Sequence, residues 1–182
     1  IKLLCSIVFA TLIASCSNPQ KTAMTDTNHA TFAAGCFWGV ESVFMATDGV
    51  LSTEVGYTGG NNAFTSYKDV CSGETGHAEA VHITFDPQVV SYTRLLDVFY
   101  ANHDATQVNR QGPDFGTQYR TAIFVHSDEQ RQQAIDARAA LDDSKILPHP
   151  VATVIEDAVE FIRAEEYHQQ YNLKNGISCQ TQ

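Results

Sequence analysis

The order of apolar patterns between residues 30 and 125 constrains the fold of this chain more than any other feature. Alternation every two residues predicts a strand, and apolar residues three or four apart predict a helix. These patterns predict a strand at 30–34, a helix at 36–47, strands at 51–57 and 79–85, a helix at 91–102 and a strand at 119–125. Thr58-Gly59-Gly60 and Asp86-Pro87 end the second and third strands, because such residues favour turns.

This strand–helix–strand–strand–helix–strand order is typical of the ferredoxin-like, split βαβ fold, an α/β plait of the α+β class. Further along, the patterns predict a helix at 127–141, a short strand at 151–155, a helix at 164–173 and a coiled C-terminal tail. Ser127 and Gln130 form a capping box at the start of the first of these. The loops 58–78 and 103–118 are long, and long loops often carry function. We therefore expect one domain over 30–182.

Composition fits a globular domain and disfavours one class of partner. The 182 residues are 43% hydrophobic, which is enough for a sizeable core. Eleven Lys and Arg oppose 21 Asp and Glu, for a formal net charge of −10, so nucleic acid is an unfavourable partner. Seven Tyr and ten Phe also argue against a disordered acidic chain, which would be poor in aromatic residues.

The N-terminal segment is predicted to be a targeting signal. Residues 3–14 are apolar, which is too short for a membrane-spanning helix of about 20 residues but suits the core of a secretory signal. Ile13-Ala14-Ser15-Cys16 resembles the lipobox of bacterial lipoproteins, which implies removal of 1–15 and a lipid on Cys16. An ordinary secretory signal is the alternative. With 16–29 as a flexible tether, we expect a domain of the bacterial cell envelope that faces the periplasm and is lipid-anchored to a membrane.

Cys36 has the features of a reactive thiol. It lies in Gly35-Cys36-Phe37-Trp38-Gly39, where the first predicted strand turns into the first helix. Free backbone N–H groups and the helix dipole at such a position favour the thiolate, which is the nucleophilic form. The rings of Phe37 and Trp38 suggest an apolar pocket for a small uncharged group. A buried structural cysteine between packed aromatic residues is the alternative that this segment leaves open.

Glu79 is the predicted proton donor. On strand 79–85 it shares a face with three apolar residues, Val81, Ile83 and Phe85. Burial disfavours a charged carboxylate, so we expect a raised pKa that keeps Glu79 protonated near neutral pH. That protonated state is what a general acid needs. A solvated carboxylate at the rim of the strand is the alternative.

The histidines do not predict a metal centre. His77 and Glu79 lie on one face of the strand and His82 on the other, so these side chains cannot converge on one zinc ion. The remaining histidines of the domain show no pairing with Cys36. We assign packing, loop or hydrogen-bonding roles to His103, His126, His149 and His168.

Several short segments, taken together, point to one family. Besides 35–39 they are Gly56-Tyr57-Thr58-Gly59-Gly60, Val70-Cys71-Ser72-Gly73, Thr75-Gly76-His77-Ala78-Glu79, Asn109-Arg110-Gln111-Gly112, Gly116-Thr117-Gln118-Tyr119-Arg120 and Tyr167-His168-Gln169-Gln170-Tyr171. In this order they resemble the type A peptide methionine sulfoxide reductases over roughly residues 31–179. The resemblance implies a monomer that reduces the S-epimer of methionine sulfoxide, free or in oxidised proteins. It implies a thioredoxin-like thiol reductant and no metal, flavin or nicotinamide cofactor.

The resemblance also implies how the thiols work. Cys36 matches the nucleophile that attacks the sulfoxide sulfur, and Glu79 matches the acid that protonates the sulfoxide oxygen. The products are methionine and a sulfenic acid on Cys36, which a second thiol converts to a disulfide. We predict that Cys179, near the end of the tail, is this resolving thiol. Cys71, in a Gly-rich loop, is interpreted as a buried structural cysteine.

Further residues match the substrate site of the family. Phe37 and Trp38 match the pocket for the methyl group of the substrate. Tyr67 and Tyr119 match tyrosines that hydrogen-bond around the sulfoxide oxygen. Asp114 matches a carboxylate that accepts a hydrogen bond from the backbone N–H of the substrate.

Two other functions remain open from the residues alone. Another thiol catalyst, such as a peroxidase or a Cys–Glu hydrolase, would use Cys36 and Glu79 in different chemistry. A non-catalytic lipoprotein would bind oxidised methionine through Phe37, Trp38 and Glu79. Formation of methionine from the S-sulfoxide separates the reductase from both alternatives.

Overall fold

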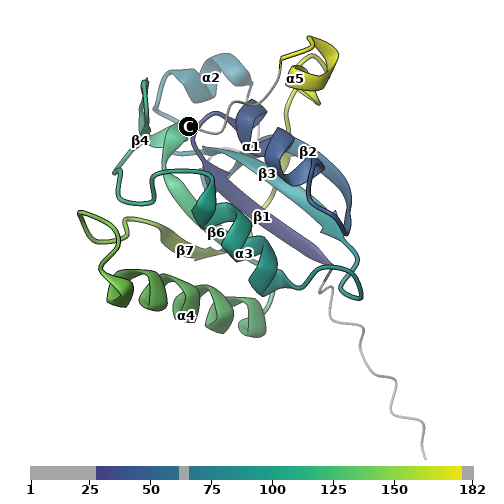
Figure 1. Ribbon diagram of the computed structural model, residues 1–182. Coiled ribbons are helices and arrows are strands. Elements are labelled where there is room, and N and C mark those ends of the chain that lie inside the picture. Colours follow the sequence, from purple (N-terminus) through teal and green to yellow (C-terminus); the bar gives the residue numbers. More distant parts are fainter. Residues whose placement is uncertain (1–27, 62–65, 178–182) are drawn as a thin grey trace, which may run out of the picture.

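The main sheet of the protein has the strand order β7-β6-β1-β3-β2-β8 (Figure 1). Its members are β1 (His29–Ala34), β2 (Val50–Thr58), β3 (Ala78–Phe85), β6 (Thr121–Val125), β7 (Val154–Asp157) and β8 (Ile162–Arg163). Neighbouring strands are antiparallel except β6 and β7, which are parallel. A separate hairpin pairs β4 (Arg110–Gln111) with β5 (Asp114–Phe115).

The four central strands reproduce the predicted plait. Across the sheet, the order β6-β1-β3-β2 places the fourth predicted strand beside the first, followed by the third and the second. The connecting helices α1 (Phe37–Met45) and α3 (Tyr92–Ala101) cover one face of the sheet, and α4 (Asp128–Ser144) packs beside α3 (Figure 1). Right-handed crossovers put both connecting helices on the same side. The predicted ferredoxin-like fold is confirmed.

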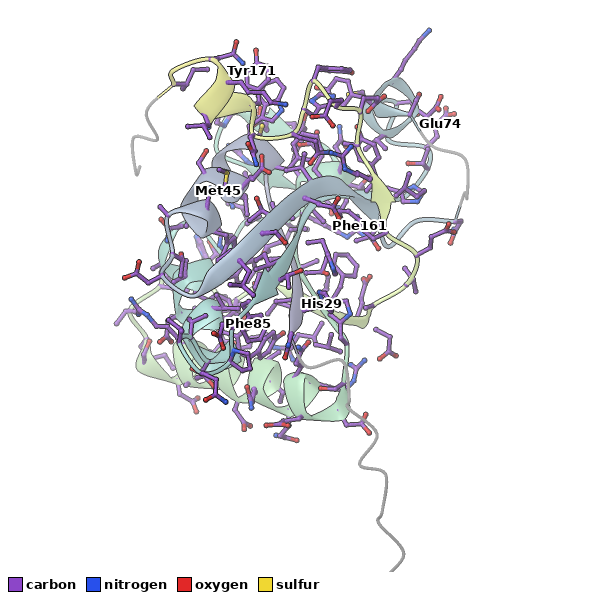
Figure 2. All side chains as sticks on the ribbon, turned by 90° about the vertical axis from the view of Figure 1, so that its right-hand side faces the viewer. His29, Met45, Glu74, Phe85, Phe161 and Tyr171 are labelled. Carbon is purple, nitrogen blue, oxygen red and sulfur yellow. The ribbon has the colours of Figure 1, made fainter. Side chains whose placement is uncertain are left out.

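The sheet is buried on both faces. Toward the helices, Phe32 of β1 stacks on Phe44 of α1 and Phe99 of α3, with ring centroids 5.2 Å and 5.1 Å away. On the other face the sheet presents mostly small side chains, over which Phe161 packs (Figure 2). These small residues are Ala33, Ala78, Ala80 and Ala122. Alternate residues of one strand therefore enter different cores, as the two-residue period of a strand requires.

A short helix, α2 (Tyr67–Cys71), lies within the region predicted as a loop at 58–78. Its capping residue Ser66 accepts a hydrogen bond from the backbone N–H of Asp69, and the Asp69 carboxylate accepts one from the backbone N–H of Ser66. Such a capping box satisfies donors that would otherwise be unpaired at a helix start. The helix begins at Tyr67 and thereby positions a predicted site residue.

The predicted helix at 164–173 is wrong. After β8 ends at Arg163, the chain instead forms a series of turns and then the one-turn helix α5 (Tyr171–Lys174). Gln169 is the physical reason, because its side-chain amide bonds both the N–H and the carbonyl of Val55 in β2, each at 2.9 Å. Gln170 then adopts a left-handed conformation with φ of 52°, which interrupts a right-handed helix. The predicted strand at 151–155 is also displaced, and β7 begins at Val154.

The computed structural model describes residues 28–61 and 66–177. The predicted signal 1–15, the lipobox Cys16, the tether up to residue 27 and the predicted resolving Cys179 lie outside this range. Within the range, the helices fall short of the length and apolar character needed to cross a membrane.

Candidate active site

Strand β1 delivers Cys36 to the start of helix α1. Gly35 joins the two elements with a φ of 90°, and an added Cβ there would lie 2.6 Å from the Cβ of Gln111. Both the backbone conformation and the space therefore require glycine. Cys36 is the capping residue of α1, whose first residue is Phe37, and its side chain is only partly exposed.

Glu79 meets the same helix start from the neighbouring strand. Strands β1 and β3 are antiparallel, so the end of β1 lies beside the beginning of β3, where Glu79 is only 2% exposed. Its Oε2 accepts a hydrogen bond from the backbone N–H of Phe37 at 3.1 Å. Cys36 and Glu79, the predicted nucleophile and acid, thus meet at one helix terminus, where Cys36 is the capping residue and Glu79 is hydrogen-bonded to the next residue, Phe37.

Burial of Glu79 produces the raised pKa that the strand pattern predicts. The pKa rises to about 7, mainly because burial disfavours the carboxylate, and the negative charge of Asp114 adds to the effect. The hydrogen bond from Phe37 opposes the rise without cancelling it. Glu79 is therefore available as a neutral proton donor near pH 7.

The predicted thiolate character of Cys36 is wrong for the free site. Burial and the neighbouring charge of Glu79 raise the pKa of the thiol to about 12, although the backbone N–H groups of Trp38 and Gly39 favour the thiolate. The helix terminus that the sequence rule relies on also donates to Glu79, through Phe37. Desolvation therefore outweighs the helix start, and the pKa of about 12 favours the neutral thiol over the thiolate near neutral pH.

The remaining polar residues of the predicted site surround this pair. Tyr119, the last residue of the 3₁₀ helix η1 (Thr117–Tyr119), has a pKa raised to about 12 by burial and by the charge of Glu79. Asp114 on β5 is close enough for its charge to raise the pKa values of Cys36 and Glu79. Burial raises the pKa of Tyr67 above its ordinary value, with Glu79 contributing. The structure thus brings Cys36, Glu79, Tyr67, Tyr119 and Asp114 together.

The two aromatic residues after Cys36 have different environments. Phe37 is 1% exposed and packs on Tyr57, with ring centroids 5.9 Å apart. Trp38 is partly exposed, and its ring stacks on Tyr171 at a centroid distance of 3.8 Å and an interplanar angle of 10°. The indole N–H of Trp38 donates to Nδ1 of His168 at 3.1 Å. The sequence assigned His168 a packing, loop or hydrogen-bonding role without identifying Trp38 as its partner, and its position in the Tyr167–Tyr171 segment was the available signal.

The C-terminal segment is bound to the same helix. Gln170 donates its backbone N–H to Glu41 of α1 at 2.7 Å, and the Asn172 side chain donates to the Trp38 carbonyl at 3.1 Å. In Figure 1, α5 lies close to α1, and Figure 2 shows Tyr171 at that end of the molecule. The C-terminal segment is therefore held against α1, the helix whose first turn follows Cys36, a few residues before Cys179.

Cys71 corrects another expectation, because it is exposed rather than buried. It ends the short helix α2, where little of the chain covers it.

No group of three or more His, Cys, Asp or Glu side chains within residues 28–61 and 66–177 is arranged to hold a metal ion.

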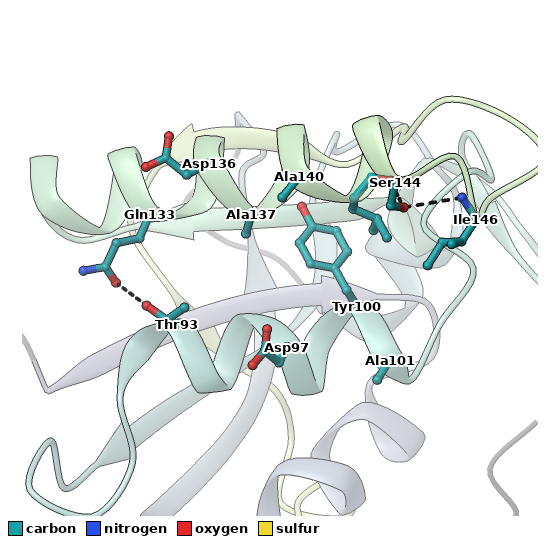
Figure 3. A pocket seen from close by; sticks show the side chains of 11 residues that line it. Thr93, Asp97, Tyr100, Ala101, Gln133, Asp136, Ala137, Ala140, Ser144 and Ile146 are labelled. Atoms are coloured by element: carbon teal, nitrogen blue, oxygen red, sulfur yellow. Dashed lines mark hydrogen bonds between the residues drawn. The ribbon is translucent and has the colours of Figure 1, made fainter.

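A groove of the described surface lies elsewhere, between α3 and α4. Figure 3 shows its lining, where Thr93 of α3 donates to Gln133 of α4 at 3.3 Å. Small residues such as Ala137 and Ala140 leave this space between the helices. Its lining includes the carboxylates of Asp97 and Asp136 but no cysteine or histidine, and none of the residues of the predicted site lies in it.

Comparison with known proteins agrees with this geometry. Residues 28–182 match the family model described as peptide methionine sulfoxide reductase. The MsrA protein of Methanothermobacter thermautotrophicus is 59% identical over 146 residues, which are 80% of this chain and 86% of that protein.

Solved structures give the same result. Reduced Mxr1 from Saccharomyces cerevisiae is 37% identical, with a TM-score of 0.77 and coverage of 84% of this chain and 88% of that one. Mxr1 from the same yeast in complex with Trx2 is 26% identical, with a TM-score of 0.56 and coverage of 79% and 83%. By sequence and fold, this chain belongs to the type A peptide methionine sulfoxide reductase family.

Proposed function

We propose that this protein, as a monomer, reduces the S-epimer of methionine sulfoxide, free or in oxidised proteins, and thereby repairs oxidative damage. The observation that carries the proposal is that Glu79 is hydrogen-bonded to Phe37, the residue after Cys36, so that a carboxyl group with a pKa of about 7 holds a proton at the helix terminus that carries the thiol. A sulfoxide oxygen leaves poorly unless it is protonated, so a nucleophile and a neutral acid must reach it together.

The first step transfers the sulfoxide oxygen to Cys36. Glu79 donates its proton to the oxygen while the sulfur of Cys36 attacks the sulfoxide sulfur, which forms a bond between the two sulfur atoms, and the Cys36 thiol proton restores Glu79. The resulting hydroxyl then moves from the substrate sulfur to the Cys36 sulfur as the S–O and S–S bonds to the substrate both break, so the products are methionine and a Cys36 sulfenic acid. Oε2 of Glu79 is bound to Phe37, which leaves Oε1 to hold the proton that is transferred. Tyr67 and Tyr119 bind the oxygen, Asp114 accepts the substrate N–H, and Phe37 and Trp38 contact the methyl group.

The second step restores the thiol. Cys179 attacks the sulfenic acid on Cys36, which forms a disulfide and releases water, and a thioredoxin-like donor then reduces that disulfide. The attachment of residues 170–172 to α1 supports this role, because it starts the tail beside Cys36. The complex of yeast Mxr1 with Trx2 supports the class of donor. The family needs no prosthetic cofactor for this cycle.

We further propose that the domain works in the bacterial cell envelope, facing the periplasm. The apolar residues 3–14 and the lipobox-like Ile13–Cys16 support an exported lipoprotein with the lipid on Cys16. Thioredoxin of the cytosol would not reach such a domain, so the donor in this arrangement is a thioredoxin-like protein of the same compartment.

Activity with a simple thiol tests the proposal directly. With dithiothreitol, the wild type should form methionine from the S-sulfoxide and leave the R-sulfoxide unchanged. Cys36→Ser should abolish the reaction because it removes the sulfur nucleophile, whereas Cys71→Ser should keep it. Methionine is measured by chromatography. A wild-type protein that binds the S-sulfoxide without forming methionine is a binding protein, and the proposal is then wrong.

Glu79→Gln should have opposite effects on thiol reactivity and on catalysis. Removing the carboxylate charge lowers the pKa of Cys36, so alkylation of Cys36 by iodoacetamide at pH 8–9 should become several-fold faster. Sulfoxide reduction should fall by about 10²–10⁴-fold, because the proton donor is lost. Alkylation is followed in a Cys71→Ser, Cys179→Ser background, with exposed Glu74→Gln as the matched control. Unchanged reduction in Glu79→Gln would refute the acid assignment.

Replacement of the resolving thiol should separate formation of methionine from recycling. Without reductant, Cys179→Ser should still release about one mole of methionine per mole of enzyme, since Cys36 needs no partner for the first step. Multiple turnovers with a thioredoxin-type donor should be lost. Cys71→Ser is the control and should recycle normally. Normal recycling by Cys179→Ser, or its loss in Cys71→Ser, would transfer the resolving role away from Cys179.

The membrane anchor has its own test. Full-length protein expressed in a bacterium that processes lipoproteins should appear in the membrane fraction with a mature N-terminus at Cys16. Mass spectrometry should show acyl chains on that residue, and Cys16→Ser should abolish them. A soluble, unmodified N-terminus in the wild type would contradict the anchor.

A further inference from the structure

His168 occupies the centre of an aromatic cluster beside Cys36. It is 1% exposed, and its ring centroid lies 5.2 Å from that of Phe37, 4.5 Å from Tyr67 and 4.1 Å from Tyr167. A buried polar ring is unfavourable unless it forms hydrogen bonds. The bond from the Trp38 indole to Nδ1, at 3.1 Å, supplies one.

The chemistry of the two rings determines the protonation state of His168. An indole N–H can only donate, so Nδ1 must be an unprotonated acceptor, and the proton of the neutral imidazole lies on Nε2. Nε2 has no hydrogen-bond partner within the described part of the chain. A second proton would have to bind Nδ1, where it would break the bond to Trp38.

The groups that face His168 favour this neutral form. Burial lowers the pKa of His168, and the nearby charge of Glu165 opposes that effect only in part. Glu165 is itself bound to the Tyr57 hydroxyl at 2.9 Å and to the Tyr67 backbone N–H at 3.1 Å. The other titratable groups against the ring are the hydroxyls of Tyr67 from α2 and of Tyr167 from the same segment.

Trp38 needs this bond because its other restraint is incomplete. Stacking on Tyr171, with an interplanar angle of 10°, restricts the tilt of the indole. A stacked ring can still slide or rotate within its own plane, whereas a hydrogen bond to one edge prevents that movement. The two contacts together therefore restrain both the tilt of the indole and its rotation within its plane.

We propose that His168 is a positioning residue that orients Trp38 and so shapes the pocket for the methyl group of the sulfoxide. The inference deepens the proposed function and rests on it. His168 acts through Trp38 and has no part in the proton transfers between Glu79 and the substrate.

Trp38 is the only tryptophan in the sequence, so its fluorescence reports this contact without interference. His168→Leu and His168→Gln remove the acceptor at the Nδ1 position, whereas His168→Asn places a carbonyl oxygen there. We expect the emission of substrate-free protein to shift in the first two variants and to resemble the wild type in the third. If the leucine variant does not fold, the glutamine variant replaces it.

Kinetics and pH complete the test. His168→Leu should raise KM for the S-sulfoxide about tenfold with a smaller effect on kcat, and His168→Asn should reverse most of this. Wild-type emission should change with a midpoint below about 6.5, because protonation of His168 breaks the bond to Trp38. That change should vanish in His168→Asn and persist in His149→Asn, a control at an exposed position.

A double-mutant cycle distinguishes positioning from general packing. In a Trp38→Phe background, which lacks the indole N–H, His168→Leu should have no additional effect on KM. An equal effect in both backgrounds, or a failure of His168→Asn to restore emission and KM, would overturn the proposal. Absence of reductase activity in the wild type would instead refute the proposed function, while the emission series would still decide whether His168 orients Trp38.

Discussion

The hydrogen bond from the backbone N–H of Phe37 to Glu79 is the interaction on which the site depends. It joins the end of β1, the start of α1 and the start of β3, so that the acid from one strand faces the thiol that the other strand delivers. The same bond uses one carboxyl oxygen and leaves the second for the substrate. Because a backbone donor at a helix start has no intrahelical partner, the fold supplies this contact without an additional side chain.

The balance of energies at this helix start explains why the thiol is neutral. A rise in the pKa of Cys36 from 9.0 to about 12 corresponds to about 4 kcal/mol against ionisation. A helix terminus contributes about 0.3–1 kcal/mol in favour of a negative charge at an exposed site and up to about 2 kcal/mol at a partly buried one. Burial therefore dominates, which fits the proposed mechanism, in which the substrate is activated by protonation rather than the thiol by prior ionisation. Burial also raises the pKa of Glu79, so one physical cause favours the neutral form of both groups.

The sequence predicts the plait because its strands and helices are long enough for their periods to be distinct. It favours a buried Glu79 because that residue shares a strand face with Val81, Ile83 and Phe85, although the pattern alone also allowed a solvated carboxylate at the rim. It fails where a side chain replaces regular structure. Gln169 hydrogen-bonds the backbone of Val55, 114 residues away, and no local pattern contains that contact. His168 was missed for the same reason, since its partner Trp38 is 130 residues away. Local rules also missed the neutral thiol, because they describe the helix start without the carboxyl group that shares it.

Helix α1 joins the parts of the proposed cycle that must act in sequence. Its first turn carries the wall of the methyl pocket, and Trp38 and Glu41 also hold the C-terminal segment through Asn172 and Gln170. From Asn172, seven residues lead to Cys179, a span of at most about 25 Å. A short connection reduces the entropy lost when two groups of one chain meet and gives the tethered group a high effective concentration. The proposed cycle therefore resolves the sulfenic acid within the molecule, and in that cycle the external donor needs to recognise only the finished disulfide.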